Sequence, residues 1–157
     1  MYARRLRHWL CVIFAVVSAL LTTGCGITPF PFDRYDAPAS IRKVSGYLSV
    51  VYCRNLKVDT VVIQERITLD SDWVTLFRAK GVLELERGDN VVQEAQSQGL
   101  ELSPGSEPHL TAGSQIIVML DGFGTSSTSI FSLESDLSSD LWLHPDGSQS
   151  LEACPNK

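Results

Sequence analysis

The chain has 157 residues, with 18 acidic and 13 basic side chains and a formal net charge of −5 at pH 7. A nucleic-acid partner is disfavoured, because binding to phosphates needs concentrated Lys and Arg. The length suits one domain with a sizeable core rather than two ordinary domains.

The N-terminal segment has the three parts of a secretory signal. Three arginines precede an apolar run from Trp9 to Leu21, and small residues follow up to Cys25. The run has 13 residues (21 − 9 + 1). As a helix such a run would reach about 20 Å, against roughly 30 Å for the hydrocarbon core of a bilayer. The segment is therefore predicted to be a signal rather than a membrane span. An uncleaved anchor is the alternative.

With Gly24 and Cys25 at its end, the segment resembles the signal of bacterial lipoproteins, whose lipobox ends in Gly-Cys or Ala-Cys. The resemblance implies cleavage between these two residues, and a diacylglyceryl group and fatty chains such as palmitate on Cys25. The family most often has Leu where this chain has Thr22. Gly26, in place of an Asp, implies sorting to the outer membrane. The expected location is therefore the periplasmic face of the outer membrane rather than the inner membrane.

Cleavage would divide the chain into three parts. Removing residues 1–24 leaves 133 residues (157 − 24), with a net charge of 10 − 18 = −8. Residues 25–40 contain three prolines and are predicted to be a lipidated tether, and residues 41–157 the globular domain. From Gly99 onward the only basic residue is Lys157. This acidic half is either a surface that attracts a cationic partner or metal, or ordinary solvated loops.

The four cysteines leave one pair available for a disulfide. Cys11 departs with the signal and Cys25 takes the lipid, so Cys53 and Cys154 remain together in an oxidising compartment. A disulfide between them would close a loop of about 100 residues and, in the chain-entropy model, contribute ~4.7 kcal/mol. A reactive or metal-binding pair is the alternative. No Cys-x-x-Cys motif and no neighbouring His favours it.

Short stretches of alternating or β-branched residues predict most of the mature chain to be strand. Glu65 interrupts one apolar face, so that face is expected to be open at its middle or to contain a bulge. Gly81 is expected to turn the chain, and residues 91–96 form either a short strand or a helical turn. The spacing predicts an all-β, mainly antiparallel, small sandwich or barrel-like domain of about seven to nine strands. Strands are predicted at residues 44–53, 60–69, 73–79, 82–86, 115–120, 128–133 and 141–144.

The segment before residue 144 has a competing helical pattern. Ile130, Leu133, Leu137 and Leu141 have helical spacing. Ser and Asp fill the gaps between them, and both favour caps and turns over helix interiors. Two short strands around a serine-rich loop are therefore preferred.

Catalytic residues are sparse in this sequence. Ser114, His144 and Asp146 supply the residue types of a triad, but no Gly-x-Ser-x-Gly elbow accompanies them. An enzyme is the least favoured class, and no cofactor is predicted.

Metal ligands and short motifs give weak signals. The candidate ligands for zinc are only His109, His144 and scattered acidic residues. The candidate ligands for calcium are Asp136 and Asp140, which lie in a polar loop without EF-hand spacing. The tripeptide at residues 87–89 is Arg-Gly-Asp, which is predicted to be a hairpin turn rather than an integrin-type motif. Two glycines at residues 122–124 lack the rest of a phosphate loop.

These observations favour a membrane-anchored envelope lipoprotein that binds another envelope protein, as an accessory or scaffold subunit of an assembly. The alternative is a lipoprotein that binds carbohydrate or Ca²⁺ through the acidic C-terminal loops.

Overall fold

A computed structural model describes residues 38–103 and 105–155. The predicted signal at residues 1–24, Cys25 and most of the predicted tether lie outside the described residues. The described part contains nine strands and one helix. The elements are β1 (Ala39–Val44), β2 (Tyr47–Tyr52), β3 (Leu56–Arg66), β4 (Val74–Leu85), α2 (Val91–Ser97), β5 (Glu101–Ser103), β6 (Gln115–Gly122), β7 (Thr125–Ser132), β8 (Trp142–Leu143) and β9 (Gln149–Ser150).

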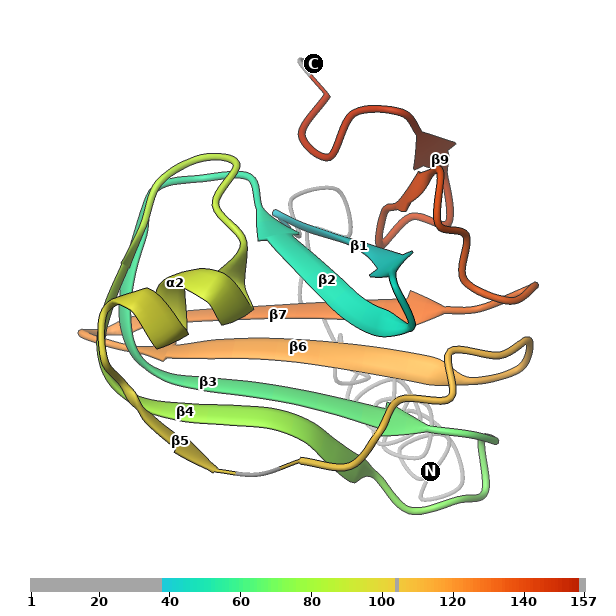
Figure 1. Ribbon diagram of the computed structural model, residues 1–157, viewed down its shortest axis with the longest axis horizontal. Coiled ribbons are helices and arrows are strands. Elements are labelled where there is room, and N and C mark those ends of the chain that lie inside the picture. Colours follow the sequence, from blue (N-terminus) through green and yellow to red (C-terminus); the bar gives the residue numbers. More distant parts are fainter. Residues whose placement is uncertain (1–37, 104, 156–157) are drawn as a thin grey trace, which may run out of the picture. The chain divides into compact units, whose positions relative to one another are not determined.

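The strands form two antiparallel sheets with a shared core (Figure 1). The larger sheet has the order β5-β4-β3-β6-β7, and the smaller has the order β2-β1-β8-β9. Buried side chains of both sheets form one apolar cluster, which includes Ile41 and Val50 from the smaller sheet and Ile63, Val118 and Phe131 from the larger. Helix α2 packs against β4 and β2. This arrangement confirms the predicted all-β sandwich.

The first predicted strand, at 44–53, is part of a hairpin that β1 and β2 form. Ser45 and Gly46 have φ values of +51° and +88°, which suit a two-residue turn between antiparallel strands. Most of the predicted strand at 44–53 is β2, but the turn at its start and the strand β1 before it were missed, and residues 39–40, assigned to the tether, lie in β1. The apolar alternation continues through the turn, and it conceals the reversal.

Strand β4 continues through Gly81, where the sequence predicted a turn. The pairing of β3 with β4 shifts register between Val58 and Thr60, which is typical of a β-bulge. Gly81 has a φ of +127°, and a Cβ there would lie 3.3 Å from Leu100 Cγ. The glycine therefore allows a bulge in one long strand instead of ending it.

Glu65 lies in the buried face of β3. Its side chain is only 2% exposed, and its two carboxylate oxygens accept the backbone N–H groups of His109 and Leu110 at 2.9 and 2.8 Å. A second register shift, between Ile63 and Gln64, confirms that a bulge interrupts this strand pair. The face is closed rather than open, because the loop after β5 covers it.

Two further alternatives are settled by the structure. Residues 91–97 form helix α2, whose N-cap Asn90 accepts the backbone N–H groups of Val92 and Gln93. β7 and β8 lie where two short strands were preferred over a helix.

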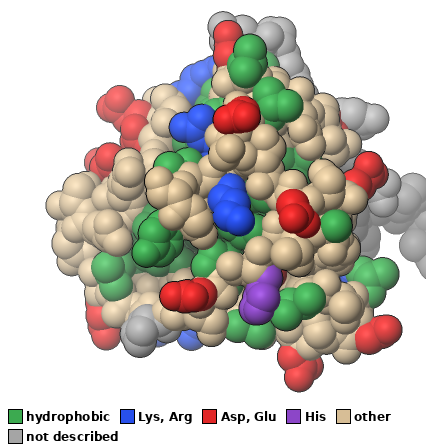
Figure 2. Space-filling model, turned by 45° about the vertical axis from the view of Figure 1, so that its right-hand side comes forward, with side chains coloured by type: hydrophobic (Ala, Val, Ile, Leu, Met, Phe, Trp, Pro, Cys, Tyr) green, Lys and Arg blue, Asp and Glu red, His purple; other side chains and the backbone are tan. Residues whose placement is uncertain are grey.

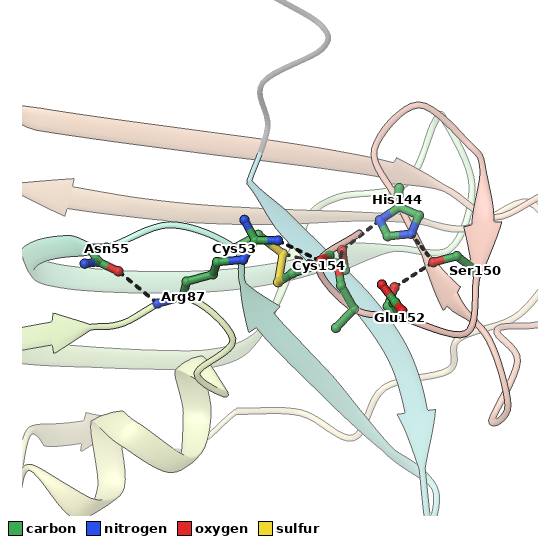
Figure 3. Close-up of a disulfide and its surroundings, with 9 residues drawn as sticks. Cys53, Asn55, Arg87, His144, Ser150, Glu152 and Cys154 are labelled. Carbon is green, nitrogen blue, oxygen red and sulfur yellow. Dashed lines mark hydrogen bonds between the residues drawn. A yellow bond between two sulfur atoms is a disulfide. The ribbon is translucent and has the colours of Figure 1, made fainter. Parts of the chain in front are cut away.

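The predicted disulfide between Cys53 and Cys154 is present, with a Cα–Cα distance of 5.3 Å across a sequence separation of 101 residues (Figure 3). It joins the end of β2 to the C-terminal tail. Arg87 Nη2 donates a hydrogen bond to the Cys154 carbonyl at 2.7 Å and adds a polar link to the same point.

Candidate functional site

The structure does not bring together the three residues that supply the residue types of a triad. Ser114 is fully buried, and its hydroxyl donates to the carbonyl of Thr111 at 2.8 Å. The two ring nitrogens of His144 instead lie 2.8 Å from the hydroxyls of Ser40 and Ser150. Asp146 lies near His144, but the hydroxyl of Ser114 is bonded elsewhere and makes no contact with the imidazole.

The pairing of Ser40 with His144 lacks the features of a catalytic pair. Ser40 is 1% exposed and donates its hydroxyl proton to the carbonyl of Ala153 at 2.6 Å. Burial lowers the pKa of His144, and the nearby charge of Asp146 opposes this shift only in part. Hydrogen bonds from Ser148 hold the pKa of Asp146 below its ordinary value. His144 therefore links β1 to the C-terminal tail (Figure 3).

The residues considered for calcium have other partners. Asp136 Oδ1 accepts the backbone N–H of Ala112 at 3.0 Å, and Asp140 Oδ1 accepts the hydroxyl of Ser139 at 3.3 Å. Within residues 38–103 and 105–155, no three His, Cys, Asp or Glu side chains gather closely enough to hold a metal ion. His109 lies 3.4 Å from Glu65, as an exposed partner of that buried carboxylate.

The two short motifs form turns. In the Arg-Gly-Asp tripeptide at 87–89, the carboxylate of Asp89 accepts the backbone N–H of Glu86 at 2.7 Å and closes the turn. Residues 122–124 join β6 to β7, with φ values of +50° at Phe123 and +78° at Gly124. A turn at 87–89 is confirmed, but it is not a hairpin turn, because it leads from β4 to α2.

A groove lies beside the edge strand of the smaller sheet. It has a volume of about 780 Å³, and it runs along β2 between the β1–β2 hairpin, α2 and residues 105–108. Apolar side chains predominate in its lining, among them Tyr47, Leu76, Phe77 and Trp142, with polar groups such as Asn90 and Gln93 between them. Volumes of this size, with apolar walls and few polar groups, are typical of binding sites.

Buried contacts position the wall at residues 105–108. The loop is fixed at its C-terminal end by the bonds from His109 and Leu110 to Glu65. At its other end, Ser106 donates its backbone N–H to the carbonyl of Thr75 at 3.0 Å. Gly105 passes so close to β4 that a Cβ would overlap the carbonyl of Leu76. The wall is therefore held at both ends by the larger sheet.

Asn90 positions the wall formed by α2. Besides capping the helix, its amide nitrogen donates to the hydroxyl of Ser49 on β2 at 2.8 Å. An isolated bridge pairs Asn90 with Val51 in antiparallel orientation. One residue thus caps the helix and attaches it to the edge strand.

Arg42 is the basic residue that lines the groove. Its guanidinium carbon lies 4.4 Å from the ring centroid of Trp142, within the range of a cation–π contact. Its Nε is buried and has no hydrogen-bond partner among the described residues. Figure 2 shows one face of the molecule, on which hydrophobic side chains are interspersed with basic and acidic ones. A buried donor without a partner is costly unless a ligand or water supplies an acceptor.

The sequence did not reveal this groove. Arg42 lies next to the predicted end of the tether, and Trp142 lies in a short predicted strand 100 positions later (142 − 42). The apolar pattern predicted a strand at Trp142 but none at Arg42, which lies before the first predicted strand at 44–53. It contained no information on which strands become neighbours.

Comparisons with models of protein families, with curated proteins and with solved structures find no match for this chain. In the part of the chain that the structure describes, no helix is both long and apolar enough to cross a membrane.

Proposed function

We propose that this chain is a lipid-anchored protein of the bacterial envelope and that it acts by binding a partner protein in the groove beside β2. The groove is the observation that carries the proposal, because its volume of about 780 Å³ combines apolar walls with an unpartnered cationic donor. The rigid attachment of both walls supports recognition, since preformed sites lose less entropy when they bind.

The proposed location rests on the N-terminal sequence and is supported by the disulfide. Disulfides persist in oxidising compartments such as the periplasm. The signal and the lipidated Cys25 would export the chain and anchor it, and two or more fatty chains hold a protein firmly at a membrane. Replacement of Cys25 by Ser should move the protein from the membrane fraction to the soluble fraction. Retention of the variant in the membrane would contradict lipid anchoring.

Photocrosslinking in cells tests the binding role. In one strain a photoreactive amino acid replaces Gln93, which is exposed on α2 and lines the groove. In a second strain it replaces Gln149, which is also exposed but lies in β9, outside the groove. Illumination should give a discrete crosslinked species from position 93 and not from position 149. No adduct at 93, or the same adducts at both positions, would contradict a binding role for the groove.

A further inference from the structure

We infer that the groove binds an extended peptide segment of a partner protein, which pairs as an added strand with the free edge of β2 and places an acidic side chain on Arg42. This inference rests on the proposed function and names the class of partner. It follows from the backbone of β2, from the side chains on its two faces, and from the charge of the groove.

The backbone of β2 has hydrogen-bonding groups on its free edge. β2 is the edge strand of its sheet, and its other side pairs with β1. In a hairpin with a two-residue turn, Val44 and Tyr47 form the first hydrogen-bonded pair, and such pairs then occupy every second position. The N–H and C=O groups of Leu48 and the N–H of Val50 therefore point away from β1. No hydrogen bond between these groups and a described loop or α2 is present.

The far end of the same edge already accepts a short strand-like segment. Tyr52, which follows Leu48 and Val50 in the outward series, donates its N–H to the Asp89 carbonyl at 3.0 Å and accepts the Gly88 N–H at 2.7 Å. The bridge between Val51 and Asn90 belongs to the same pairing. Residues 88–90 thus occupy the end of the edge, and the remainder is left for a partner.

The groove reaches both faces of β2, as an added strand requires. The register of the hairpin places Arg42 and Ser49 on one face and Leu48 on the other, toward the core. Leu76 and Phe77 line the groove on the core side. Successive side chains of a strand point to opposite faces. A bound segment would therefore direct one side chain toward Arg42 and the next toward Leu48 and Phe77.

The charges of the groove favour a single acidic residue in that segment. The buried Nε of Arg42 lacks an acceptor among the described residues, and a carboxylate would supply one in a charge-assisted bond. Glu107, exposed on the opposite wall, would repel a run of acids. A sugar fits less well, because Arg42 covers the ring of Trp142, which is only 7% exposed and cannot offer an open stacking face.

Selection from a random peptide library tests this inference, and it does not require the partner to be identified first. Hexapeptides displayed on phage are selected on the full-length protein in lipid nanodiscs, and the recovered sequences are synthesised for affinity measurement. We expect one acidic residue with apolar residues at alternating positions. Arg42→Gln should weaken binding about tenfold, since it removes a charge-assisted bond. Lys43→Gln is the matched control, because Lys43 carries the same charge on the next residue and does not line the groove. It should change the affinity less than about twofold.

Two further measurements distinguish strand addition from other modes. Two peptides are made, one methylated at the backbone amides of the odd residues and one at those of the even residues. Only one of these two peptides should fail to bind, because only one set of amides donates to β2. Hydrogen exchange over residues 47–52 should slow when the unmethylated peptide binds. If neither methylated peptide binds more weakly than the unmethylated one, or if the acid is dispensable, the inference is wrong.

The outcomes separate this inference from the proposed function. If the library yields no binder while position 93 still gives a crosslinked species in cells, the groove binds something other than an extended peptide and only the inference fails. If the library yields no binder and the crosslinking gives no product, both the inference and the proposed binding role fail.

Discussion

In the five-stranded sheet, β3 and β6 pair over seven successive residue pairs, whereas in the four-stranded sheet β1 and β8 share a single pair. The larger sheet also supplies most of the fully buried apolar side chains, such as Val61, Ile116 and Phe131. β8 and β9 have only two residues each, so hydrogen-bonded ladders contribute little to their attachment.

The C-terminal strands of the smaller sheet, β8 and β9, are attached through side chains instead. The disulfide, the bond from Arg87 to the Cys154 carbonyl, and His144 between Ser40 and Ser150 all connect the C-terminal segment to the rest of the domain (Figure 3). The comparison indicates two sources of stability in one sandwich. Long ladders and apolar burial maintain the larger sheet and the β1–β2 hairpin, and a few covalent and polar links hold β8, β9 and the C-terminal segment. Each link is therefore a point at which the smaller sheet can be loosened separately.

Removal of the disulfide should have the largest effect. The double variant Cys53→Ala, Cys154→Ala releases a loop of about 100 residues, for which the chain-entropy model gives a loss of ~4.7 kcal/mol. We expect the melting temperature to fall by roughly 10 °C or more. Hydrogen exchange should accelerate first in β1, β8 and β9 and later in β3 and β6. Equal acceleration in both sheets would contradict the comparison.

Glu65→Gln should give the next largest loss of stability, and this loss should come from the larger sheet. Glutamine replaces one of the two carboxylate oxygens by an NH2 group, so the N–H of either His109 or Leu110 would face a donor instead of its acceptor, and the remaining bond would no longer be charge-assisted. The expected loss is about 2–3 kcal/mol in urea unfolding. Glu86→Gln is the control, because it removes the same charge from an exposed side chain. A loss no larger than that of the control would show that Glu65 does not hold the loop.

The same two regions differ in how far the sequence predicted them. Alternation at residues 60–69 and the apolar run at 115–120 predicted two central strands of the larger sheet, because ladders of this length impose a periodic pattern. Glu65 was recognised as an interruption, but its partners lie 44 and 45 residues away and have no local signature.

In the smaller sheet, local pattern was less informative. Counting cysteines predicted the disulfide, since only one pairing remained. The hairpin at Ser45 and Gly46 was missed, although a residue pair that tolerates positive φ is a turn signal. The groove was missed altogether, because Arg42 and Trp142 become neighbours only through the pairing of β1 with β8.

Asn90→Ala sharpens the comparison at the helix that contacts both sheets. The variant removes the cap acceptor for Val92 and Gln93 and the donor to Ser49, and we expect a loss of about 1 kcal/mol. Asn90→Asp is the matched control, because it retains the cap acceptor and replaces the amide donor by a carboxylate oxygen. If both variants are equally destabilised, the link to β2 matters more than the cap. Hydrogen exchange in α2 and in β2 would locate the loss.

Titration of His144 should give the smallest effect, confined to the smaller sheet. Burial lowers its pKa in the folded protein below the ordinary value of 6.5. Between these two pKa values the unfolded chain binds more protons than the folded one, so stability rises with pH. The contribution of His144 should therefore be complete above pH 6.5 and should decline as the pH falls below it.

The difference between wild type and His144→Gln isolates this residue, because the two proteins share every other ionisable group. We expect the urea midpoint of the wild type, relative to the variant, to decrease from pH 8 to pH 5. The change should be small, because the ring is only partly buried and water stabilises much of its charge. A relative increase in acid would mean that the hydroxyls of Ser40 and Ser150 stabilise the charged ring more than burial penalises it. Acid would then tighten the C-terminal segment rather than loosen it.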